Sequence, residues 1–340
     1  MELPSSAKVD KPSCMRQVGG FCIADSSSVW QEVVDSLAIS VLAAEGSSWL
    51  RRAKAAFLSV LRHPLWRRLI PKKEGAPIAM GSQIDVAFQG RYGKWIAFDL
   101  KQDLVIRRIA TKELYDREVW IRSLPVVETL SPDIMSWDDE SFTYCEQYVR
   151  GRPVQLHDLD EGLTVLRNLW PSLGAVYEVK TSKAPLKLPS PRENETLFRV
   201  VYRAGLAEAF EKVQGREVKQ GLVHGDLKHP NVIVRGDEVY VIDWGEQFFL
   251  APPLFDLLYY LYWHTRSFAP EIVVNRALCN PQWIEDGLPG SLEPAAVKAS
   301  LCVFAAEMVS RTKEERRQEY HLKKLVSFLE VVATQLEAIS

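Results

Sequence analysis

Apolar residues recur at helical spacing in two stretches near the N-terminus. This pattern predicts one helix over about residues 29–45 and a second over about residues 48–63, which ends at Pro64 because proline cannot continue a helix. Residues 1–28 are polar and are expected to be poorly ordered. We therefore expect an N-terminal helical extension over residues 1–75.

The pattern changes near Gly75, where short apolar runs separated by turn residues replace the helical spacing. These runs predict a small antiparallel sheet, with strands over residues 84–88, 95–100, 104–109 and 142–149. A helix over about residues 111–124 is expected to interrupt the strands, so the sheet-rich part occupies residues 76–149. From residue 150 to 340 the chain is mostly helical, with one predicted helix over about residues 193–214.

Composition adds three constraints to this picture. The chain has 340 residues, of which 47% are hydrophobic and 25% charged, so it can bury a large core in about two domains. No window is long and apolar enough for a membrane span, and we expect no secretory signal because the first twenty residues contain charges but no apolar run. The five cysteines are scattered and odd in number, which is typical of a protein of the reducing cytoplasm.

Charge is unevenly distributed along the chain. The formal net charge is −2, yet residues 47–73 contain basic side chains and no acidic ones. Three interpretations of this basic stretch stay open: a solvated helix face docked on the rest of the protein, peripheral contact of residues 49–73 with an anionic membrane, or binding of an anionic acceptor or nucleic acid. Of these partners, nucleic acid is not expected.

The segment from residue 224 to residue 244 contains the most informative residues. It reads His-Gly-Asp-Leu-Lys-His-Pro-Asn, then two β-branched runs around a Gly-Asp turn, then Asp-Trp. The runs predict a hairpin, and to within one residue of register Asn231 and Asp243 face each other at its open end. An amide oxygen and a carboxylate in that position suit Mg²⁺. Asp226 can reach the same point and orient an attacking hydroxyl, while Lys228 can meet phosphate oxygens.

This constellation resembles the catalytic and metal-binding loops of the protein-kinase-like superfamily, and most of all its aminoglycoside phosphotransferase and choline kinase branch. By that resemblance Asp226 is the catalytic base, and Asn231 and Asp243 hold Mg²⁺. His224 is structural, and Asp256 supports it.

Upstream of these loops the resemblance implies a nucleotide site for ATP. Arg107, or its neighbour Arg108, stands where the family has the strand residue that grips the ATP phosphates, because strand alternation lets only one of the two face the nucleotide. Glu118 is its implied ion-pair partner, with Glu113 as the alternative.

Two further segments complete the implied nucleotide site. Gly81 and Ser82 belong to the loop that would cover the phosphates, although this loop has a single glycine. Glu146 and Tyr148 belong to the segment whose backbone would bind adenine.

The resemblance implies an α+β, bilobal protein-kinase-like fold, with a small antiparallel-sheet N-lobe, a larger helical C-lobe and the N-terminal helical extension. It also implies an ATP- and Mg²⁺-dependent kinase. Only twelve residues separate Asp243 from Asp256, which leaves no activation segment and favours a hydroxyl of a non-protein acceptor: a sugar, a glycolipid, an amino alcohol or an aminoglycoside-like compound. A minimal protein kinase, favoured by Lys228, and a nucleotide-binding pseudokinase remain as alternatives.

The remaining expectations concern the location of the protein in the cell and the aromatic residues that follow Asp256. The protein is expected in the cytoplasm or at the cytoplasmic face of the membrane. The aromatic residues of segment 259–263 are expected to pack in the core of the large lobe. The sequence identifies neither the acceptor nor the oligomeric state.

Overall fold

The structure is a computed structural model of the 340-residue chain. It describes residues 15–18, 21–24, 72–73, 86–89, 94–189, 194–244, 249–288, 293–312 and 318–337. The chain divides into two compact units: unit 1 contains residues 1–117 and 132–150, and unit 2 contains residues 118–131 and 151–340. The helices predicted over residues 29–45 and 48–63 lie outside the described residues.

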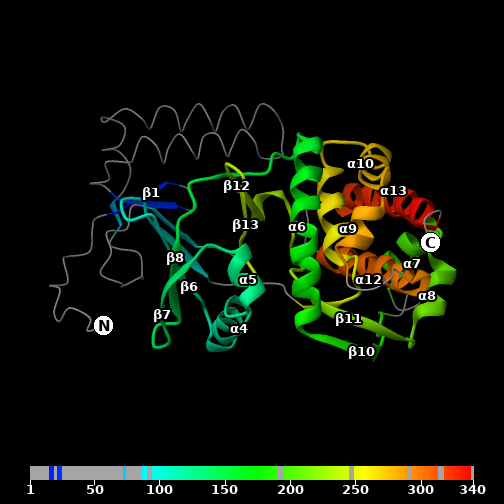
Figure 1. Cartoon of the computed structure of the whole chain (residues 1–340), viewed down its shortest axis with the longest axis horizontal. Coiled ribbons are helices and arrows are strands. Elements are labelled where there is room, and N and C mark those ends of the chain that lie inside the picture. The colour runs from blue at the N-terminus through cyan, green and yellow to red at the C-terminus, as the bar shows by residue number, and fades with distance from the viewer. Residues whose placement is uncertain are drawn as a thin grey trace. The chain divides into compact units, whose positions relative to one another are not determined.

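Unit 1 is built on an antiparallel sheet, in which the described strands follow the order β3-β1-β2-β4-β5-β6-β8-β7 (Figure 1). Their bounds are Met15–Val18 (β1), Phe21–Ala24 (β2), Lys72–Lys73 (β3), Val86–Gln89 (β4), Trp95–Asp99 (β5), Leu104–Arg108 (β6), Ile134–Asp138 (β7) and Thr143–Gln147 (β8). Strands β4, β5, β6 and β8 are the ones that the short apolar runs predict. Strands β1 to β3 and β7 are additional, and the first three come from the stretch interpreted as a helical extension.

The turn between β5 and β6 has a local cause. The Oδ1 atom of Asp99 accepts hydrogen bonds from the backbone N–H groups of Lys101 and Gln102, at 3.2 and 3.1 Å. Asp103 then adopts a φ of 54°, which aspartate tolerates better than most residues. The resulting register sets Ile96 opposite Arg107.

Helix α4 (Lys112–Arg122) follows β6, and the boundary between the two units falls within it. In unit 1 its Tyr115 is buried, lies against Trp137 and Phe142, and donates a hydrogen bond to Asp139 at 2.8 Å. These aromatic contacts join the start of the helix to the β7–β8 hairpin.

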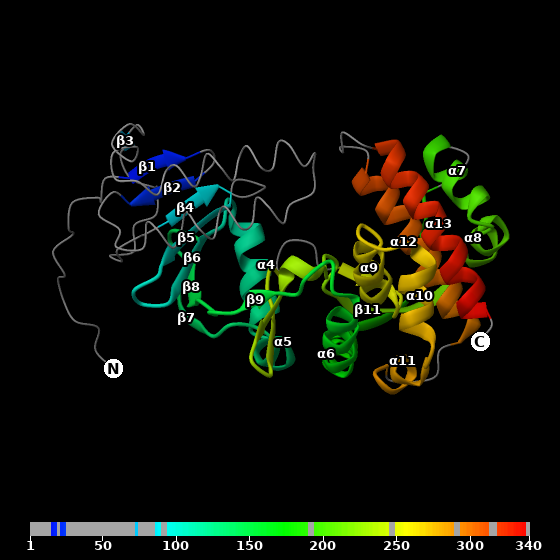
Figure 2. The same cartoon turned by 90° about the horizontal axis from the view of Figure 1, so that it is seen from above.

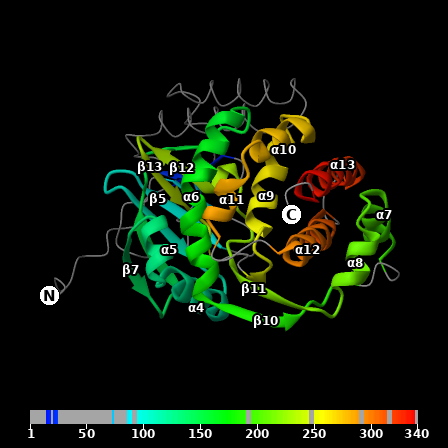
Figure 3. The same ribbon diagram turned by 45° about the vertical axis from the view of Figure 1, so that its right-hand side comes forward.

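Unit 2 is mainly helical, as predicted, so the α+β class is confirmed. Its helices are α5 (Pro125–Leu130), α6 (Leu159–Val179), α7 (Glu195–Arg203), α8 (Ala207–Val213), α9 (Phe255–His264), α10 (Pro270–Leu278), α11 (Gln282–Asp286), α12 (Pro294–Thr312) and α13 (Gln318–Glu337). Its strands are β9 (Arg152–Pro153), β10 (Thr181–Pro185), β11 (Glu217–Val223), β12 (Val232–Arg235), β13 (Glu238–Val241) and β14 (Phe249–Ala251). Figure 3 shows β10 and β11 passing the end of α6, and β11 packs against that helix.

The single helix predicted over residues 193–214 is wrong. Two helices, α7 and α8, replace it, because the chain breaks at Gly205, whose φ of +70° is a left-handed conformation that ends a helix. Helices α12 and α13 lie beside this pair (Figure 2).

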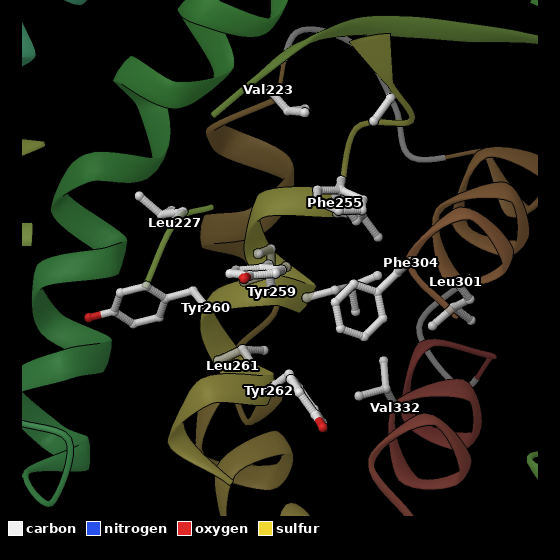
Figure 4. Packing of buried hydrophobic residues seen from close by; sticks show 14 of the residues in the cluster. Val223, Leu227, Phe255, Tyr259, Tyr260, Leu261, Tyr262, Leu301, Phe304 and Val332 are labelled. Carbon is white, nitrogen blue, oxygen red and sulfur yellow. The ribbon is translucent and has the colours of Figure 1, made fainter. Parts of the chain in front are cut away.

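Helix α9 is at the centre of the core of unit 2. Tyr259, Tyr260 and Tyr262 are all buried, which confirms their predicted packing role. Figure 4 shows Tyr260 pointing toward α6, where its hydroxyl donates to the carbonyl of Gly162 at 3.2 Å, while Phe304 approaches α9 from the other side. Within the described part of the chain, no helix is long and apolar enough to cross a membrane.

Candidate active site

The loop that carries Asp226 is anchored by a buried carboxylate. Asp256, in the first turn of α9, accepts hydrogen bonds from the backbone N–H groups of His224 at 2.7 Å and Gly225 at 2.9 Å. Burial raises the pKa of Asp256, an effect that His224 and these N–H groups oppose. Gly225 has a φ of +77°, so the anchored loop requires a glycine at this position.

The His224 ring is held from two sides, as expected for a structural histidine. Its Nε2 atom lies 3.0 Å from the carbonyl oxygen of Ile242, and its Nδ1 atom accepts the backbone N–H of Asp226 at 3.2 Å. The Nε2 atom is therefore the protonated one. The ring joins the end of the hairpin to the loop, and it also packs against Trp244 at 4.7 Å between centroids.

The Asp226 carboxylate receives hydrogen bonds from three side chains. Lys228 Nζ donates to Oδ2 at 2.6 Å, and Asn231 Nδ2 donates to the same oxygen at 3.2 Å. The Tyr259 hydroxyl donates to Oδ1 at 2.7 Å. Since a carboxylate offers about four acceptor positions, Oδ1 is the oxygen with room for a further donor.

Tyr259 is a site residue that the sequence did not identify. Its aromatic neighbours and helical spacing indicate core packing, and nothing in that pattern shows that its hydroxyl would reach a residue 33 positions away. Burial raises the pKa of Tyr259, and the charge of Asp226 raises it further, so the hydroxyl stays a proton donor in this hydrogen bond.

Asn231 is oriented so that its amide oxygen is available to a ligand. Its amide nitrogen donates to the backbone carbonyl of Asp226 at 2.9 Å, as well as to the carboxylate, which fixes the amide group from its nitrogen side. A hard cation such as Mg²⁺ requires oxygen ligands, and the amide oxygen is of that kind.

The pairing of β12 with β13 places Asp243 close to Asn231. Val232 pairs with Val241, and the N–H of Ile242 donates to the carbonyl of Asn231 at 2.9 Å. Ile242 is therefore the residue opposite Asn231, and Asp243 follows one position later, within the one-residue margin of the prediction. Asp243 has a φ of 63°, an uncommon conformation for a residue other than glycine and one often found at functional sites.

The donor set fits a magnesium ion held by few protein ligands. Among the residues that the structure describes, no group of three or more His, Cys, Asp or Glu side chains could hold a metal ion. Mg²⁺ in phosphoryl-transfer sites needs only one or two carboxylates, because phosphates and water supply the other ligands. Asn231 and Asp243 match that requirement.

Basic and aromatic side chains surround Lys228. Its Nζ atom lies 5.3 Å from the centre of the Trp263 ring, and the Arg266 guanidinium carbon lies 3.4 Å from the same centre. His229 packs near this ring at 6.0 Å. Burial, together with the nearby His264, Arg266 and Lys228, lowers the pKa of His229 to about 4. The imidazole is therefore neutral at neutral pH.

Arg311, near the end of α12, is a second residue that the sequence did not identify. Its Nη1 atom lies 3.9 Å from Oδ1 of Asp226, and its guanidinium carbon lies 5.0 Å from the centre of the Tyr259 ring. Its Nε atom donates to Glu307 at 2.8 Å. The contact joins residues 85 positions apart, so no local pattern could have revealed it.

Unit 1 contains the residues predicted to meet the nucleotide. Arg107 is buried and forms an ion pair with Glu146, whereas Arg108 is only half-buried. The two arginines thus have different environments, as strand alternation requires. Glu118 is also buried but belongs to unit 2, so its predicted pairing with Arg107 stays a prediction. Gly81 and Ser82 lie outside the described residues.

The backbone predicted to bind adenine is largely engaged within unit 1. Glu146 pairs with Val105 of β6 on one side and with Ile134 of β7 on the other. The N–H of Tyr148 donates to the carbonyl of Asp103 at 2.7 Å. Sheet pairing and this turn hydrogen bond thus engage part of the segment, and its predicted backbone contact with adenine stays a prediction.

Comparison with known proteins gave one family. Residues 147–280 match the model of the Phosphotransferase enzyme family. The search of curated proteins found no match.

Solved structures with a similar fold include a choline kinase, an aminoglycoside phosphotransferase and a choline/ethanolamine kinase family protein. Choline kinase LicA from Streptococcus pneumoniae is 14% identical, with a TM-score of 0.48, over 74% of this chain and 94% of that one. A thermostable mutant of aminoglycoside phosphotransferase APH(4)-Ia is 14% identical, with a TM-score of 0.48, over 73% and 94%. A choline/ethanolamine kinase family protein from Mesorhizobium loti is 12% identical, with a TM-score of 0.46, over 78% and 96%. With TM-scores below 0.5, these likenesses carry no argument about this chain.

The family match covers both loops that carry the predicted motifs, from His224 to Trp244. The resemblance inferred from those motifs is thereby confirmed: residues 147–280 are similar to phosphotransferase enzymes, and the enzyme class predicted for the chain is that of a phosphotransferase.

Proposed function

We propose that the protein is an ATP- and Mg²⁺-dependent kinase that phosphorylates a hydroxyl group of a small, non-protein acceptor. The observation that carries this proposal is the environment of Asp226. Its carboxylate is held by Lys228, Asn231 and Tyr259, and its Oδ1 atom has an acceptor position left for an incoming hydroxyl. The match of residues 147–280 to a phosphotransferase family supports the same reaction class.

The reaction balances with one base and one leaving group. Asp226 accepts the proton of the acceptor hydroxyl as the hydroxyl oxygen forms a bond to the γ-phosphorus of ATP. The bond from that phosphorus to the bridging oxygen breaks, and ADP leaves with the electron pair. Little further covalent chemistry is required of the protein, because positioning and charge stabilisation dominate phosphoryl transfer.

Asn231 and Asp243 would hold Mg²⁺, through the amide oxygen and the carboxylate respectively. When bound, the ion neutralises phosphate charge. Lys228 would meet the transferring phosphoryl group, since it already lies beside the oxygen of the base. Arg107 would contact the ATP phosphates, and its ion pair with Glu146 keeps its guanidinium in a fixed position.

The proposal is tested by nucleotide binding and turnover in parallel. We expect ATP to raise the melting temperature only when Mg²⁺ is present. We also expect ADP release with at least one acceptor of a panel of sugars, amino alcohols, aminoglycosides and glycolipids. Nucleotide stabilisation that is the same with and without Mg²⁺, together with no turnover on any acceptor, would contradict it.

Asn231→Leu provides the site variant for this test, and Asn275→Leu, on the exposed surface of α10, is its matched control. Because Asn231→Leu removes a metal ligand and one support of the base, we expect turnover to fall by about 100-fold or more. Asn275→Leu is expected to behave as the wild type. Equal activities of the two variants would remove Asn231 from the site.

A minimal protein kinase is the second candidate, because a lysine two positions after the base is typical of protein kinases. The short connection of twelve residues between Asp243 and Asp256 disfavours it. Incubation with radiolabelled ATP and a cell lysate distinguishes the two: label in small molecules supports the first proposal, and label in protein supports the second. Peripheral binding of residues 49–73 to an anionic membrane stays a separate prediction, testable with vesicles.

A further inference from the structure

The guanidinium of Arg311 has donors that the protein does not use. Its Nε atom bonds to Glu307, but the buried Nη1 atom has no hydrogen-bond partner among the residues that the structure describes. Only 18% of the side chain is exposed, so water contributes little. Arg311 is charge-compensated by Asp226 and Glu307, but a buried donor that makes no hydrogen bond is costly to a protein and calls for an explanation.

The unused donor lies beside the reacting position. Nη1 is 3.9 Å from Oδ1 of Asp226, which is the oxygen with an acceptor position left for the substrate hydroxyl. A hydroxyl bound at Oδ1 would therefore bring the neighbouring atoms of the acceptor to the guanidinium. Arginine binds phosphate and carboxylate groups with paired hydrogen bonds, so its natural partner here is an anion.

The other charges near Asp226 favour the same kind of ligand. Lys228 lies at the second oxygen of the carboxylate, and Arg266 lies against Trp263, which Lys228 also approaches. The lowered pKa of His229 reflects the same positive surroundings in addition to its burial. A cationic acceptor would need carboxylates near the base, whereas in the part of the chain that the structure describes the side chains on the Asp226 carboxylate are those of lysine, asparagine, tyrosine and arginine, and Glu307 is paired with Arg311.

We infer that the acceptor is a hydroxyl compound with an anionic group, phosphate or carboxylate, a few bonds from the reacting hydroxyl, and that Arg311 binds this group. The inference rests on the proposed function, because it assigns the substrate class of the same site. It predicts that, within the acceptor panel of the proposed function, amino alcohols and aminoglycosides are poor acceptors.

Binding in the presence of a non-transferable nucleotide tests this assignment. The full chain is saturated with Mg²⁺ and AMP-PNP, and the binding of four small probes is measured by calorimetry: glycerol 3-phosphate, glycerate, glycerol and choline. We expect one or both anions to bind at least about tenfold more tightly than glycerol or choline, and their order distinguishes phosphate from carboxylate recognition. Tighter binding of choline than of both anions, or no preference among the four probes, would overturn the inference.

Variants assign the preference to Arg311. Arg311→Gln is expected to weaken anion binding by about tenfold or more, and Arg311→Lys is expected to restore part of it. Arg276→Gln is the matched control, since Arg276 is exposed and pairs with Asp160 on the surface of unit 2. Melting temperatures of the variants show that each is folded. Unchanged anion binding in folded Arg311→Gln would overturn the assignment.

The binding of AMP-PNP shows whether a negative result concerns the proposed function or only the assignment of the acceptor. If AMP-PNP does not bind in the presence of Mg²⁺, the proposed function fails. If AMP-PNP binds normally to the wild type and to Arg311→Gln but the anions show no preference, only the assignment of the acceptor fails. A loss of AMP-PNP binding in Arg311→Gln would place Arg311 at the nucleotide and would also overturn the assignment.

Discussion

Unit 1 and unit 2 each contain a buried ionic centre. The two centres differ in how exposed their side chains are to solvent and in how completely their polar groups are hydrogen-bonded. In unit 1, Arg107 and Glu146 form a pair whose side chains are 7% and 3% exposed. In unit 2, Asp226 has an 11% exposed side chain, and its cationic neighbours Lys228 and Arg311 are 22% and 18% exposed. The first centre is an ion pair that is almost closed to solvent. The second centre is more open, and among the described residues it includes a guanidinium nitrogen, Nη1 of Arg311, without a hydrogen-bond partner.

The difference indicates what each centre does. A buried pair that is closed to solvent joins two strands and fixes the position of a guanidinium, so its loss costs stability in addition to the proposed contact of Arg107 with ATP. A more accessible carboxylate with an open acceptor position suits proton transfer, and its loss costs mainly activity. Substitutions in the centre of unit 1 should therefore lower stability, whereas substitutions in the centre of unit 2 should mainly lower activity.

The largest stability effect is expected in unit 1. Arg107→Met removes this ion pair from the buried Glu146 carboxylate and should reduce the free energy of unfolding by about 3–5 kcal/mol. The double variant Arg107→Met/Glu146→Leu should recover much of this loss, because it removes both charges. Urea denaturation measures both effects. A loss below about 1 kcal/mol in the single variant would show that the pair is not a closed structural centre.

Tyr259→Phe tests the more open centre with a smaller change. It removes the hydrogen bond to Oδ1 of Asp226 and keeps the ring that packs against Phe255. We expect kcat to fall by about tenfold, equivalent to about 1.4 kcal/mol, with little change in nucleotide affinity. Tyr202→Phe, at an exposed position on α7, is the control and should leave kcat unchanged. A Tyr259→Phe enzyme with wild-type kcat would show that the hydrogen bond has no part in positioning the base.

The smallest expected effect is on the pH dependence of stability, and it involves the buried His264 at the end of α9. Burial lowers the pKa of His264 from 6.5 to about 4, so the folded protein keeps the ring neutral while the unfolded chain protonates it below pH 6.5. The unfolded state then binds more protons, and stability should decrease as the pH falls from 6.5 toward 4, by about 1–2 kcal/mol near pH 5. The half-buried His229, whose pKa is also lowered to about 4, contributes in the same direction.

Urea denaturation over this pH range checks the effect. The pH dependence should be shallower in His264→Gln than in the wild type, whereas His157→Gln, at an exposed position, should keep the wild-type slope. Equal slopes in wild type and His264→Gln would mean that the ring is protonated in the folded state.

The sequence predicted those parts of the molecule whose geometry is set by neighbours in the chain. The β12–β13 hairpin follows from a Gly-Asp turn between β-branched runs, and it brings Asn231 within one residue of alignment with Asp243. The strands of unit 1 that are marked by short apolar runs between turn residues, β4, β5, β6 and β8, were also predicted. The break at Gly205 was not, since the apolar spacing continues through it and only the φ of that residue separates α7 from α8.

Contacts between distant segments could not be predicted in the same way. Tyr259 and Arg311 reach Asp226 from α9 and α12, and their positions depend on how whole helices pack. The family resemblance identified the contact of Asp256 with the loop, because that residue belongs to a motif, although the spacing alone did not require it. Glu146 shows another limit of the resemblance: it implied a ligand contact for this segment but did not reveal the side-chain ion pair with Arg107.

The central claim, that Asp226 is the base of a phosphoryl transfer, is tested most directly by single-turnover transfer from ATP in Asp226→Asn. The matched control is Asp237→Asn, at the exposed turn of the same hairpin. We predict that Asp226→Asn binds Mg²⁺ and AMP-PNP with wild-type affinity but transfers phosphate about 1,000-fold more slowly, while Asp237→Asn transfers at the wild-type rate. Transfer by Asp226→Asn at the rate of the control would contradict the account.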